Sequence, residues 1–275
     1  MQQHHSIVIV GGGTGGIAVA ARLSRALPRP DIAIVEPADR HYYQPLWTLV
    51  GGGAAKKEST VRDEADLIPP GATWIRDAVT AFDPERSTVV TAGGRTIHYD
   101  WLVVAPGIQI DWDAIDGLRD ALGRDGVCSN YSYDTVDSTW QFIRGLTRGT
   151  AIFTYPNTVV KCGGAPQKIM WLAEHHFRRT GVRDKIDVVF ASAGAKIFAV
   201  PKYAATLERL VRERDIITRF HHNLVALRPA AREAVFVRSE PGGSSEEVVM
   251  RYDLIHVTPP MSAPDFVKRS PLANA

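Results

Sequence analysis

The chain has 275 residues, of which 45% are hydrophobic and 23% charged, and its 32 basic and 30 acidic residues give a formal net charge of +2. This balance excludes a strongly basic nucleic-acid-binding protein, and two cysteines exclude a disulfide-stabilised secreted domain. No apolar run is long enough for a membrane-spanning helix. The first strand begins within about five residues of the N-terminus, which leaves no room for a signal or transit peptide. We therefore expect a cytoplasmic protein, either free or peripheral to the cytoplasmic face of a membrane.

A glycine-rich turn follows the first predicted strand. The apolar run 6–10 passes directly into Gly11-Gly12-Gly13-Thr14-Gly15-Gly16, a helical pattern follows, and a second strand at 31–35 ends in Glu36. This order of strand, G-x-G-x-x-G, helix, strand and acidic residue is what a dinucleotide-binding βαβ unit requires. The sequence therefore predicts that the chain binds an adenine dinucleotide.

The residues of this motif have separate expected roles. Gly11 allows a tight turn, Gly13 lets the backbone approach a pyrophosphate, and Gly16 lets the helix pack closely on the strand. The helix N-terminus offers free N–H groups and the positive end of its dipole to the phosphates. Glu36 is expected to accept hydrogen bonds from a ribose hydroxyl. The alternative is a glycine-rich turn in an α/β domain that binds no nucleotide.

The segment after Glu36 has no regular period. Residues 41–53 combine Tyr, Trp and Gly, which suits a loop that folds over a flat aromatic cofactor, although a surface loop packed on its own domain is the alternative. Four short runs separated by turns then predict an antiparallel meander, and 101–104 reads as a buried parallel strand that ends at Gly107. Gly107 is a further expected contact of the cofactor. The four runs are 73–75, 78–82, 88–90 and 96–99.

A second α/β pattern begins near residue 149. At the turn after its first strand, this copy has Pro156 to Pro166, which includes Cys162, in place of a second glycine motif. The stretch 240–245 reads as a hairpin loop. The predicted elements are strands 150–155, 187–191, 216–220 and 254–257, helices 166–179 and 202–214, and a hairpin of 233–237 with 247–250.

Two nucleotide-type domains with inserted meanders resemble the flavoproteins that contain two dinucleotide-binding domains. Within that group, three sequence segments are similar to the sulfide:quinone oxidoreductases of mitochondria and some bacteria. These segments are His41 to Gly51, Lys161 to Met170 and Val257 to Ser262. The resemblance implies that FAD contacts Thr14, Gly15, Glu36, Gln44 and Val79, with the Val79 backbone holding the adenine.

The residues around Cys162 agree with the catalytic role that the resemblance implies for it beside the flavin. The thiol lies just before a helix with Pro166 in its first turn, and Lys161 and Lys168 are close in sequence. A positive helix end and neighbouring cations favour the thiolate. A thiolate beside an oxidised flavin can carry sulfane sulfur and pass an electron pair to the ring. The alternative is an inert buried cysteine.

The remaining cysteine and the paired histidines have simpler expected roles. Cys128 lies where the chain crosses between domains, and we expect a buried structural thiol, with a redox pair with Cys162 left open. The dipeptides His175-His176 and His221-His222 are not expected to bind a metal, because adjacent residues on a helix do not face the same way.

The resemblance also implies a reaction. Sulfide attacks a cysteine disulfide or trisulfide and leaves a persulfide on one cysteine, while the other thiolate forms a charge-transfer complex with FAD, which passes two electrons to a quinone. A small thiol or sulfite accepts the sulfur. In the family, the chain then returns to the FAD domain and supplies a Gly-Asp pair, a second cysteine, and the quinone pocket with its peripheral membrane contact. None of these follows Cys162 here, so we expect a C-terminally truncated member.

Two alternatives remain open. An NADH:quinone reductase of the same architecture is disfavoured because the second glycine motif is missing. A non-catalytic truncated homologue that binds flavin or a persulfide is the other.

The expected fold is α/β, with two Rossmann-like FAD/NAD(P)-binding-type domains that carry antiparallel meanders, the first lacking its C-terminal return. The expected boundaries are 1–112 for the FAD domain, 113–148 for the crossover, 149–262 for the second domain and 263–275 for the start of the return.

Overall fold

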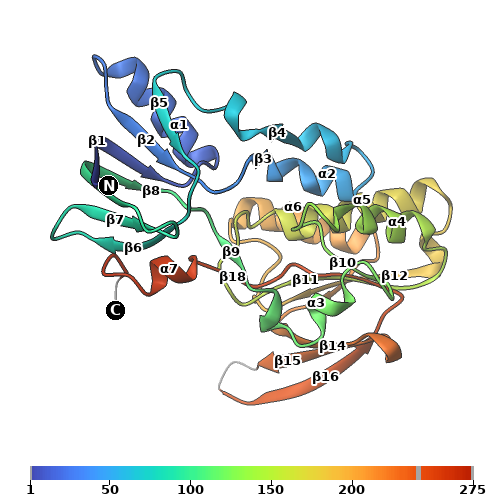
Figure 1. Cartoon of the computed structure of the whole chain (residues 1–275). Coiled ribbons are helices and arrows are strands. Elements are labelled where there is room, and N and C mark those ends of the chain that lie inside the picture. The colour runs from blue at the N-terminus through green and yellow to red at the C-terminus, as the bar shows by residue number, and fades with distance from the viewer. Residues whose placement is uncertain (1, 240–242, 274–275) are drawn as a thin grey trace. The chain divides into compact units, whose positions relative to one another are not determined.

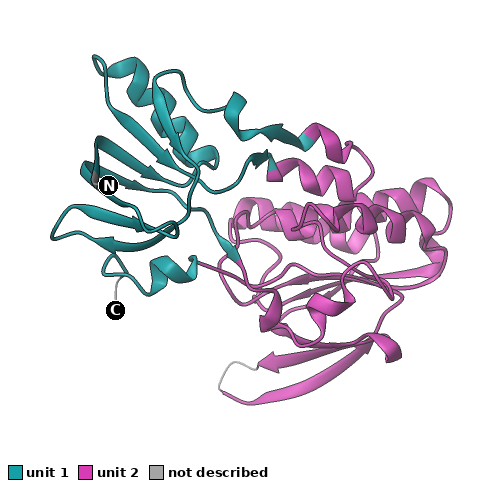
Figure 2. Cartoon of the chain, in the orientation of Figure 1, with its two compact units in different colours: residues 1–43, 60–109, 263–275 teal, residues 44–59, 110–262 magenta. Residues whose placement is uncertain are grey.

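The computed structural model describes residues 2–239 and 243–273 and divides into two compact units, each assembled from separate stretches of the chain (Figure 2). The aromatic segment after Tyr43 belongs to a different unit from the glycine turn. The first unit contains Met1–Tyr43, Thr60–Gln109 and Ala263–Ala275, and the second contains Gln44–Ser59 and Ile110–Ser262.

The first unit is built on a six-stranded sheet with the order β5-β2-β1-β8-β7-β6 (Figure 1). β1 pairs in parallel with both β2 and β8. Its apolar run from Ile7 to Val10 is buried, as expected for a central parallel strand covered on both faces. The bounds are β1 Gln2–Val10, α1 Thr14–Ala26, β2 Ile32–Val35, β5 Ala72–Ile75, β6 Val79–Asp83, β7 Thr88–Thr91 and β8 Thr96–Val104.

Smaller elements complete this unit. β3 (Arg40–Tyr42) pairs antiparallel with β4 (Val61–Asp63), and a 3₁₀ helix, Glu64–Asp66, follows β4 directly. The C-terminal helix α7 (Asp265–Lys268) packs on β6, where Phe266 stacks on Phe82 with ring centroids 5.7 Å apart.

The structure corrects three details of the predicted meander. Residues 73–75 belong to β5, which pairs in parallel with β2 and extends the main sheet. The runs 96–99 and 101–104 form one continuous strand, β8. The end of that strand is not buried, since Trp101 is 72% exposed; α1 packs on β1 and β2 and leaves this side chain open. The antiparallel arrangement of β6, β7 and the first part of β8 is confirmed.

The second unit contains a five-stranded sheet, β10-β17-β11-β12-β13, in which every pairing is parallel. Helices α4, α5 and α6 cover one face, and the three-stranded antiparallel sheet β14-β15-β16 covers the other (Figure 1). Side chains of β11 alternate between the two layers: Ala151 and Phe153 pack toward the helices and Ile152 toward the small sheet. The predicted α/β fold with Rossmann-like units is confirmed.

The strands of this unit are β10 Val127–Cys128, β11 Gly149–Tyr155, β12 Ile186–Ser192, β13 Ile217–Arg219, β14 His222–Arg228, β15 Glu233–Ser239, β16 Ser245–Arg251 and β17 Leu254–His256. Its helices are α2 Trp47–Gly51, α3 Leu118–Ala121, α4 Val136–Gly145, α5 Ala165–Arg179 and α6 Pro201–Glu213. β15 and β16 form the predicted hairpin; residues 240–242 of its predicted loop lie outside the described residues. β9 (Gln109–Ile110) and β18 (Met261–Ser262) form a two-stranded sheet.

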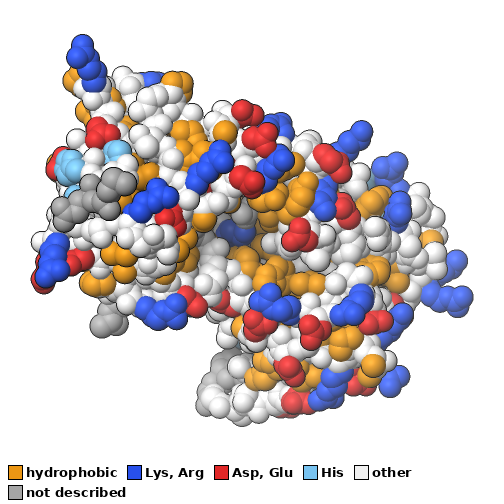
Figure 3. Space-filling model, viewed as in Figure 1, with side chains coloured by type: hydrophobic (Ala, Val, Ile, Leu, Met, Phe, Trp, Pro, Cys, Tyr) orange, Lys and Arg blue, Asp and Glu red, His pale blue; other side chains and the backbone are white. Residues whose placement is uncertain are grey.

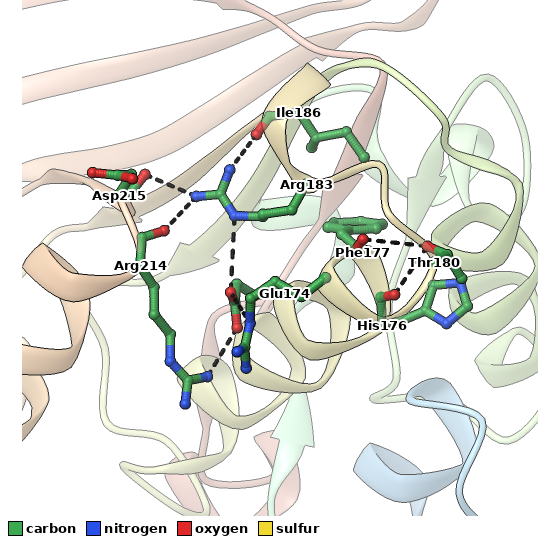
Figure 4. Close-up of polar contacts among 9 residues, drawn as sticks. Glu174, His176, Phe177, Thr180, Arg183, Ile186, Arg214 and Asp215 are labelled. Carbon is green, nitrogen blue, oxygen red and sulfur yellow. Dashed lines mark hydrogen bonds and ion pairs between the residues drawn. The ribbon is translucent and has the colours of Figure 1, made fainter.

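A buried ion cluster fixes the C-terminal half of α5 (Figure 4). The fully buried Glu174 pairs with Arg178 at 2.7 Å and with Arg214 at 2.9 Å. Arg183 approaches the same carboxylate and donates to the backbone carbonyls of Ile186, Arg214 and Asp215. A buried carboxylate needs such partners to remain charged. The cluster therefore ties α5 to the segments before β12 and after α6.

In the face shown in Figure 3, Lys and Arg side chains are interspersed with Asp and Glu over both units. None of the helices within the described ranges is both long and apolar enough to cross a membrane.

Candidate functional site

The glycine turn of the first unit has the backbone that its sequence predicts. Gly11 has a φ of +101°, and a Cβ there would collide with the carbonyl oxygen of Ala105. The Gly11 N–H donates to the carbonyl of Val35 at 2.9 Å, which ties the turn to the end of β2. Only glycine combines this positive φ with such close approach of another strand. The turn therefore lies at the carboxyl ends of β1, β2 and β8.

The helix that follows starts close to this turn and leaves one side of it open. A Cβ on Gly16 would collide with the carbonyl oxygen of Gly11, so α1 can begin here only with glycine at this position. By contrast, a Cβ on Gly13 would meet no atom within 4 Å, and one on Gly15 would meet only the Ala105 side chain at 3.8 Å. The first N–H groups of a helix lack intrahelical partners. The open side can therefore admit an anionic group to the start of α1.

Glu36 lies where the sequence predicts, directly after β2 and against the glycine turn. Its carboxylate accepts hydrogen bonds from the backbone N–H of Gly12 at 2.7 Å and of Ala38 at 2.8 Å. These bonds hold the carboxylate in one orientation, and each oxygen keeps a lone pair for a further donor. The arrangement can bind a ribose hydroxyl.

Replacement of Glu36 by alanine is expected to weaken FAD binding by about 1–3 kcal/mol, the scale for losing charge-assisted hydrogen bonds. Calorimetric titration with FAD measures this directly, with the exposed Glu85→Ala as a control for loss of one negative charge. Equal affinity of Glu36→Ala and the unmodified protein would show that Glu36 does not contact the cofactor.

Two further predicted FAD contacts lie in the same unit. Val79 is buried at the start of β6, where the register with β7 shifts between Val79 and Ala81. Gly107 follows β8 with a φ of +79° and open space around its Cα. Gln44 lies in the second unit instead, so its predicted role in the cofactor site stays a prediction.

Glu64 is the residue of this region that sequence reasoning missed. Its carboxyl group is buried next to Gly12, and its Oε2 lies 3.4 Å from Nδ1 of His41. Burial, and then the nearby carboxylate of Glu36, raise the pKa of Glu64 to about 7. In the sequence it stands in the charged run 62–66, which reads as a solvated surface and gives no signal of a buried acid.

In the second unit, Cys162 lies in the loop between β11 and α5. Its side chain is exposed, and its carbonyl accepts the N–H of Ala165, the first residue of α5. Pro166 occupies the first turn of this helix, as predicted. The loop has neither a glycine with positive φ nor the G-x-G-x-x-G spacing. It therefore presents a thiol where the first unit presents a glycine turn.

Polar side chains surround the residue before the cysteine. The Lys161 ammonium donates to Oε1 of Gln44 and lies 5.7 Å from the ring centre of Tyr131. Partial burial of this ammonium lowers the pKa of Lys161. Burial raises the pKa of Tyr131 and of Tyr155, and the nearby Cys162 thiol adds to both shifts. Two neutral phenols and one cation are therefore grouped around this loop.

Cys128 has the opposite environment. It is fully buried on β10, its thiol donates to the carbonyl of Ile255 at 3.6 Å, and burial raises its pKa to about 12. Both cysteines are free. Because a buried thiol of raised pKa is unreactive, Cys128 is the structural thiol that the sequence predicts.

Limiting iodoacetamide at neutral pH is expected to label Cys162 well before Cys128, because only the Cys162 thiol is accessible. Peptide mass spectrometry over a time course gives the order, and labelling in denaturant shows that both thiols can react. Faster labelling of Cys128 in the folded protein would refute this order.

The second unit also lacks an acidic residue for a ribose. In the first unit Glu36 follows β2, but β12 ends at Ser192 and is followed by Ala193 and Gly194. A nicotinamide dinucleotide would therefore find neither a glycine turn nor a ribose carboxylate at this sheet.

Comparison with known proteins places this fold and site in one class. Residues 5–167 match the family model of the pyridine nucleotide-disulphide oxidoreductases. The chain belongs to this family, which implies a flavin cofactor.

More specific relatives share the sequence over nearly its whole length. The chain is 50% identical over 270 residues to the mitochondrial sulfide:quinone oxidoreductase of Dictyostelium discoideum and 46% identical over 275 residues to that of Mus musculus. These alignments cover 98% and 100% of the chain but only 59% and 60% of the relatives. The predicted resemblance to sulfide:quinone oxidoreductases is confirmed, and the chain spans about three fifths of these relatives.

A solved sulfide:quinone oxidoreductase structure has a similar fold. The sulfide:quinone oxidoreductase of the hyperthermophilic bacterium Aquifex aeolicus superposes with a TM-score of 0.77 at 20% identity, covering 96% of this chain and 60% of that one.

Within residues 2–239 and 243–273, no group of three or more His, Cys, Asp or Glu side chains could hold a metal ion.

Proposed function

We propose that the protein is an FAD-dependent enzyme that oxidises hydrogen sulfide to cysteine-bound sulfane sulfur and transfers the electrons to a quinone. The observation that carries this proposal is the exposed Cys162 at the start of α5. It occupies the turn at which a second dinucleotide would otherwise bind. Relatives that are 36–50% identical over at least 98% of the chain carry the name of this activity.

The proposed cofactor is FAD, and the residues of the first unit fit its AMP half. The open space over Gly13 suits the pyrophosphate, and the oriented carboxylate of Glu36 suits the ribose. When bound, the flavin supplies a two-electron acceptor. The proposed contacts are Gly11, Gly13, Thr14, Gly15, Gly16, Glu36, Gln44, Val79 and Gly107.

Cys162 is the proposed catalytic residue. Hydrosulfide attacks a disulfide or trisulfide between the Cys162 sulfur and a second thiol, such as the further cysteine that the family resemblance implies, so that one S–S bond forms and one breaks. The products are a persulfide and a thiolate, and the electron pair lost by the sulfide leaves through that thiolate. Cys128 does not supply the second sulfur, because its thiol is buried and bonded to Ile255.

The groups around the loop support this chemistry. Lys161 places a positive charge on the residue next to the cysteine, and its contact with Gln44 fixes where that charge lies. The Tyr131 and Tyr155 phenols keep their protons at neutral pH and can donate hydrogen bonds to an anionic sulfur. Together these groups offer one positive charge and two hydrogen-bond donors near the Cys162 loop.

We also propose that a small thiol or sulfite accepts the sulfane sulfur and that the whole protein contacts a membrane peripherally, on the cytoplasmic face. On the face shown in Figure 3, basic and acidic side chains are interspersed, which favours a local contact of that face over a broad electrostatic one.

Anaerobic mixing of the FAD-loaded protein with sulfide or with NADH tests the proposal. Sulfide is expected to bleach the flavin absorbance and NADH to leave it unchanged. Bleaching by NADH alone would indicate an NADH:quinone reductase. An unchanged flavin with both donors would indicate a non-catalytic flavin- or persulfide-binding protein.

A further inference from the structure

The buried carboxyl group of Glu64 lies behind the glycine turn without a full set of partners. Its side chain is 2% exposed, and Oε1 has no hydrogen-bond partner. The other oxygen, Oε2, lies 3.4 Å from Nδ1 of His41. An unpaired carboxylate oxygen in such a place is costly. A proton on the carboxyl group would remove the cost of burying a negative charge at this place.

Gly12 brings this carboxyl group together with Glu36. A Cβ on Gly12 would collide with Oε1 of Glu64 and would lie 2.7 Å from Cγ of Glu36, so both acids pack against the same glycine. Glu36 accepts two backbone N–H bonds, which hold its carboxyl group against the turn. Two adjacent carboxyl groups do not readily ionise together. Burial and the neighbouring Glu36 raise the pKa of Glu64 to about 7, so Glu64 gains or loses its proton near neutral pH.

His41 connects Glu64 to the start of α1. Its Nδ1 faces Glu64, and its Nε2 lies 3.5 Å from Oγ1 of Thr14, the first residue of the helix. Its side chain is largely buried on β3. His41 on β3 and Glu36 after β2 are the titratable groups that face Glu64 among the described residues. The carboxyl group is thus next to Gly12 directly and is linked to Thr14 through His41.

We propose that Glu64 is a positioning residue of the dinucleotide site, which must hold a proton for the glycine turn to take up the cofactor, and that His41 keeps it beside Gly12. A bound dinucleotide brings two negative phosphates to the turn, next to the carboxyl group of Glu36. An ionised Glu64 would add a further negative charge behind Gly12, whereas the protonated form, with a proton taken from solvent, adds none. This inference rests on the proposed function only in taking FAD as the ligand.

The affinity for FAD between pH 6 and pH 8 tests the proposal, since FAD itself has no group that titrates in this interval. In the unmodified protein the affinity is expected to fall by about tenfold over this interval, as linkage to one proton requires. Glu64→Gln, a neutral side chain of the same shape, is expected to bind at pH 8 as tightly as the unmodified protein binds at pH 6. Flavin fluorescence titration gives the affinities, and melting temperatures confirm that each variant is folded.

Two controls separate Glu64 from its neighbours. Asp66→Asn removes a charge from the same short helix, but its side chain is exposed, so the pH dependence is expected to remain. His41→Gln removes the imidazole that faces Glu64 but leaves an amide that can still hold the carboxyl group by a hydrogen bond, so the pH dependence is expected to remain.

Three results would overturn the proposal: a flat profile in the unmodified protein, an unchanged profile in Glu64→Gln, or a profile lost only in His41→Gln. In each of these FAD still binds, so the proposed cofactor stands. Absence of FAD binding at every pH would contradict the proposed function itself.

Discussion

Replacement of Cys162 by serine is expected to lower sulfide-dependent quinone reduction on the order of 10³-fold or more, the scale for losing a covalent nucleophile. Serine has almost the same shape but cannot form a persulfide or an S–S bond. Because Cys162 is exposed in a loop, its removal should leave the melting temperature and the FAD content unchanged. Steady-state rates of the intact FAD-loaded protein, normalised to bound flavin, measure the effect.

Cys128→Ala is the matched control for this experiment. It also removes a thiol, but from the core of the second unit, where Cys128 packs beside Ile143 and Phe153. We expect a lower melting temperature and a turnover per bound flavin close to that of the unmodified protein. Substantial sulfide oxidation by Cys162→Ser would show that Cys162 is not the catalytic residue. Loss of sulfide oxidation in a folded Cys128→Ala would show that Cys128 takes part in the reaction.

The parts of the site that could be predicted from sequence are those that depend on short, local spacing. The turn from Gly11 to Gly16 and the acid Glu36 are fixed by one strand–helix–strand unit, and the structure places the Glu36 carboxylate on the Gly12 N–H. Similarly, the helix start after Cys162 follows from Pro166 four residues on. Such features need no knowledge of distant segments.

The errors in the first unit have a different origin. The run 73–75 has the same β-forming residues whether it joins a meander or the main sheet, and only its pairing with β2, some 40 residues away, decides between them. Asp100 separates the predicted runs 96–99 and 101–104 in the sequence. In the folded chain it lies inside β8 and bonds to Nε2 of His4 at 3.1 Å, so the strand continues through it.

The side-chain contacts around the glycine turn and around the Cys162 loop are the hardest to predict from the sequence. Glu64 comes to Gly12 from 52 positions away, and Lys161 meets Gln44 from a separate stretch of the chain. Neither pair shows any periodicity. A buried acid in a charged run is recognised only when the fold shows what covers it.

Two alanine substitutions in the glycine turn are expected to have large effects on different properties, one on stability and the other on FAD affinity. Gly16→Ala places a methyl group against the backbone of Gly11 and 3.2 Å from Cγ2 of Ile9, so α1 must shift. The free energy of unfolding should fall by about 3 kcal/mol, as for overpacking against rigid backbone. Gly13→Ala meets no atom within 4 Å, so its stability should not fall. Its methyl group instead enters the space proposed for the pyrophosphate and should weaken FAD binding by about tenfold or more, or about 1.4 kcal/mol.

Denaturant unfolding and FAD titration of the same samples separate these effects, with Gly145→Ala as the control. Gly145 ends α4, and a Cβ there also meets open space, so this variant should keep both stability and FAD affinity. The decisive variant is Gly13→Ala, because its fold is not in question and any loss must come from the ligand. If Gly13→Ala binds FAD as well as Gly145→Ala does, the pyrophosphate does not lie over Gly13, and the cofactor must enter the first unit by another route.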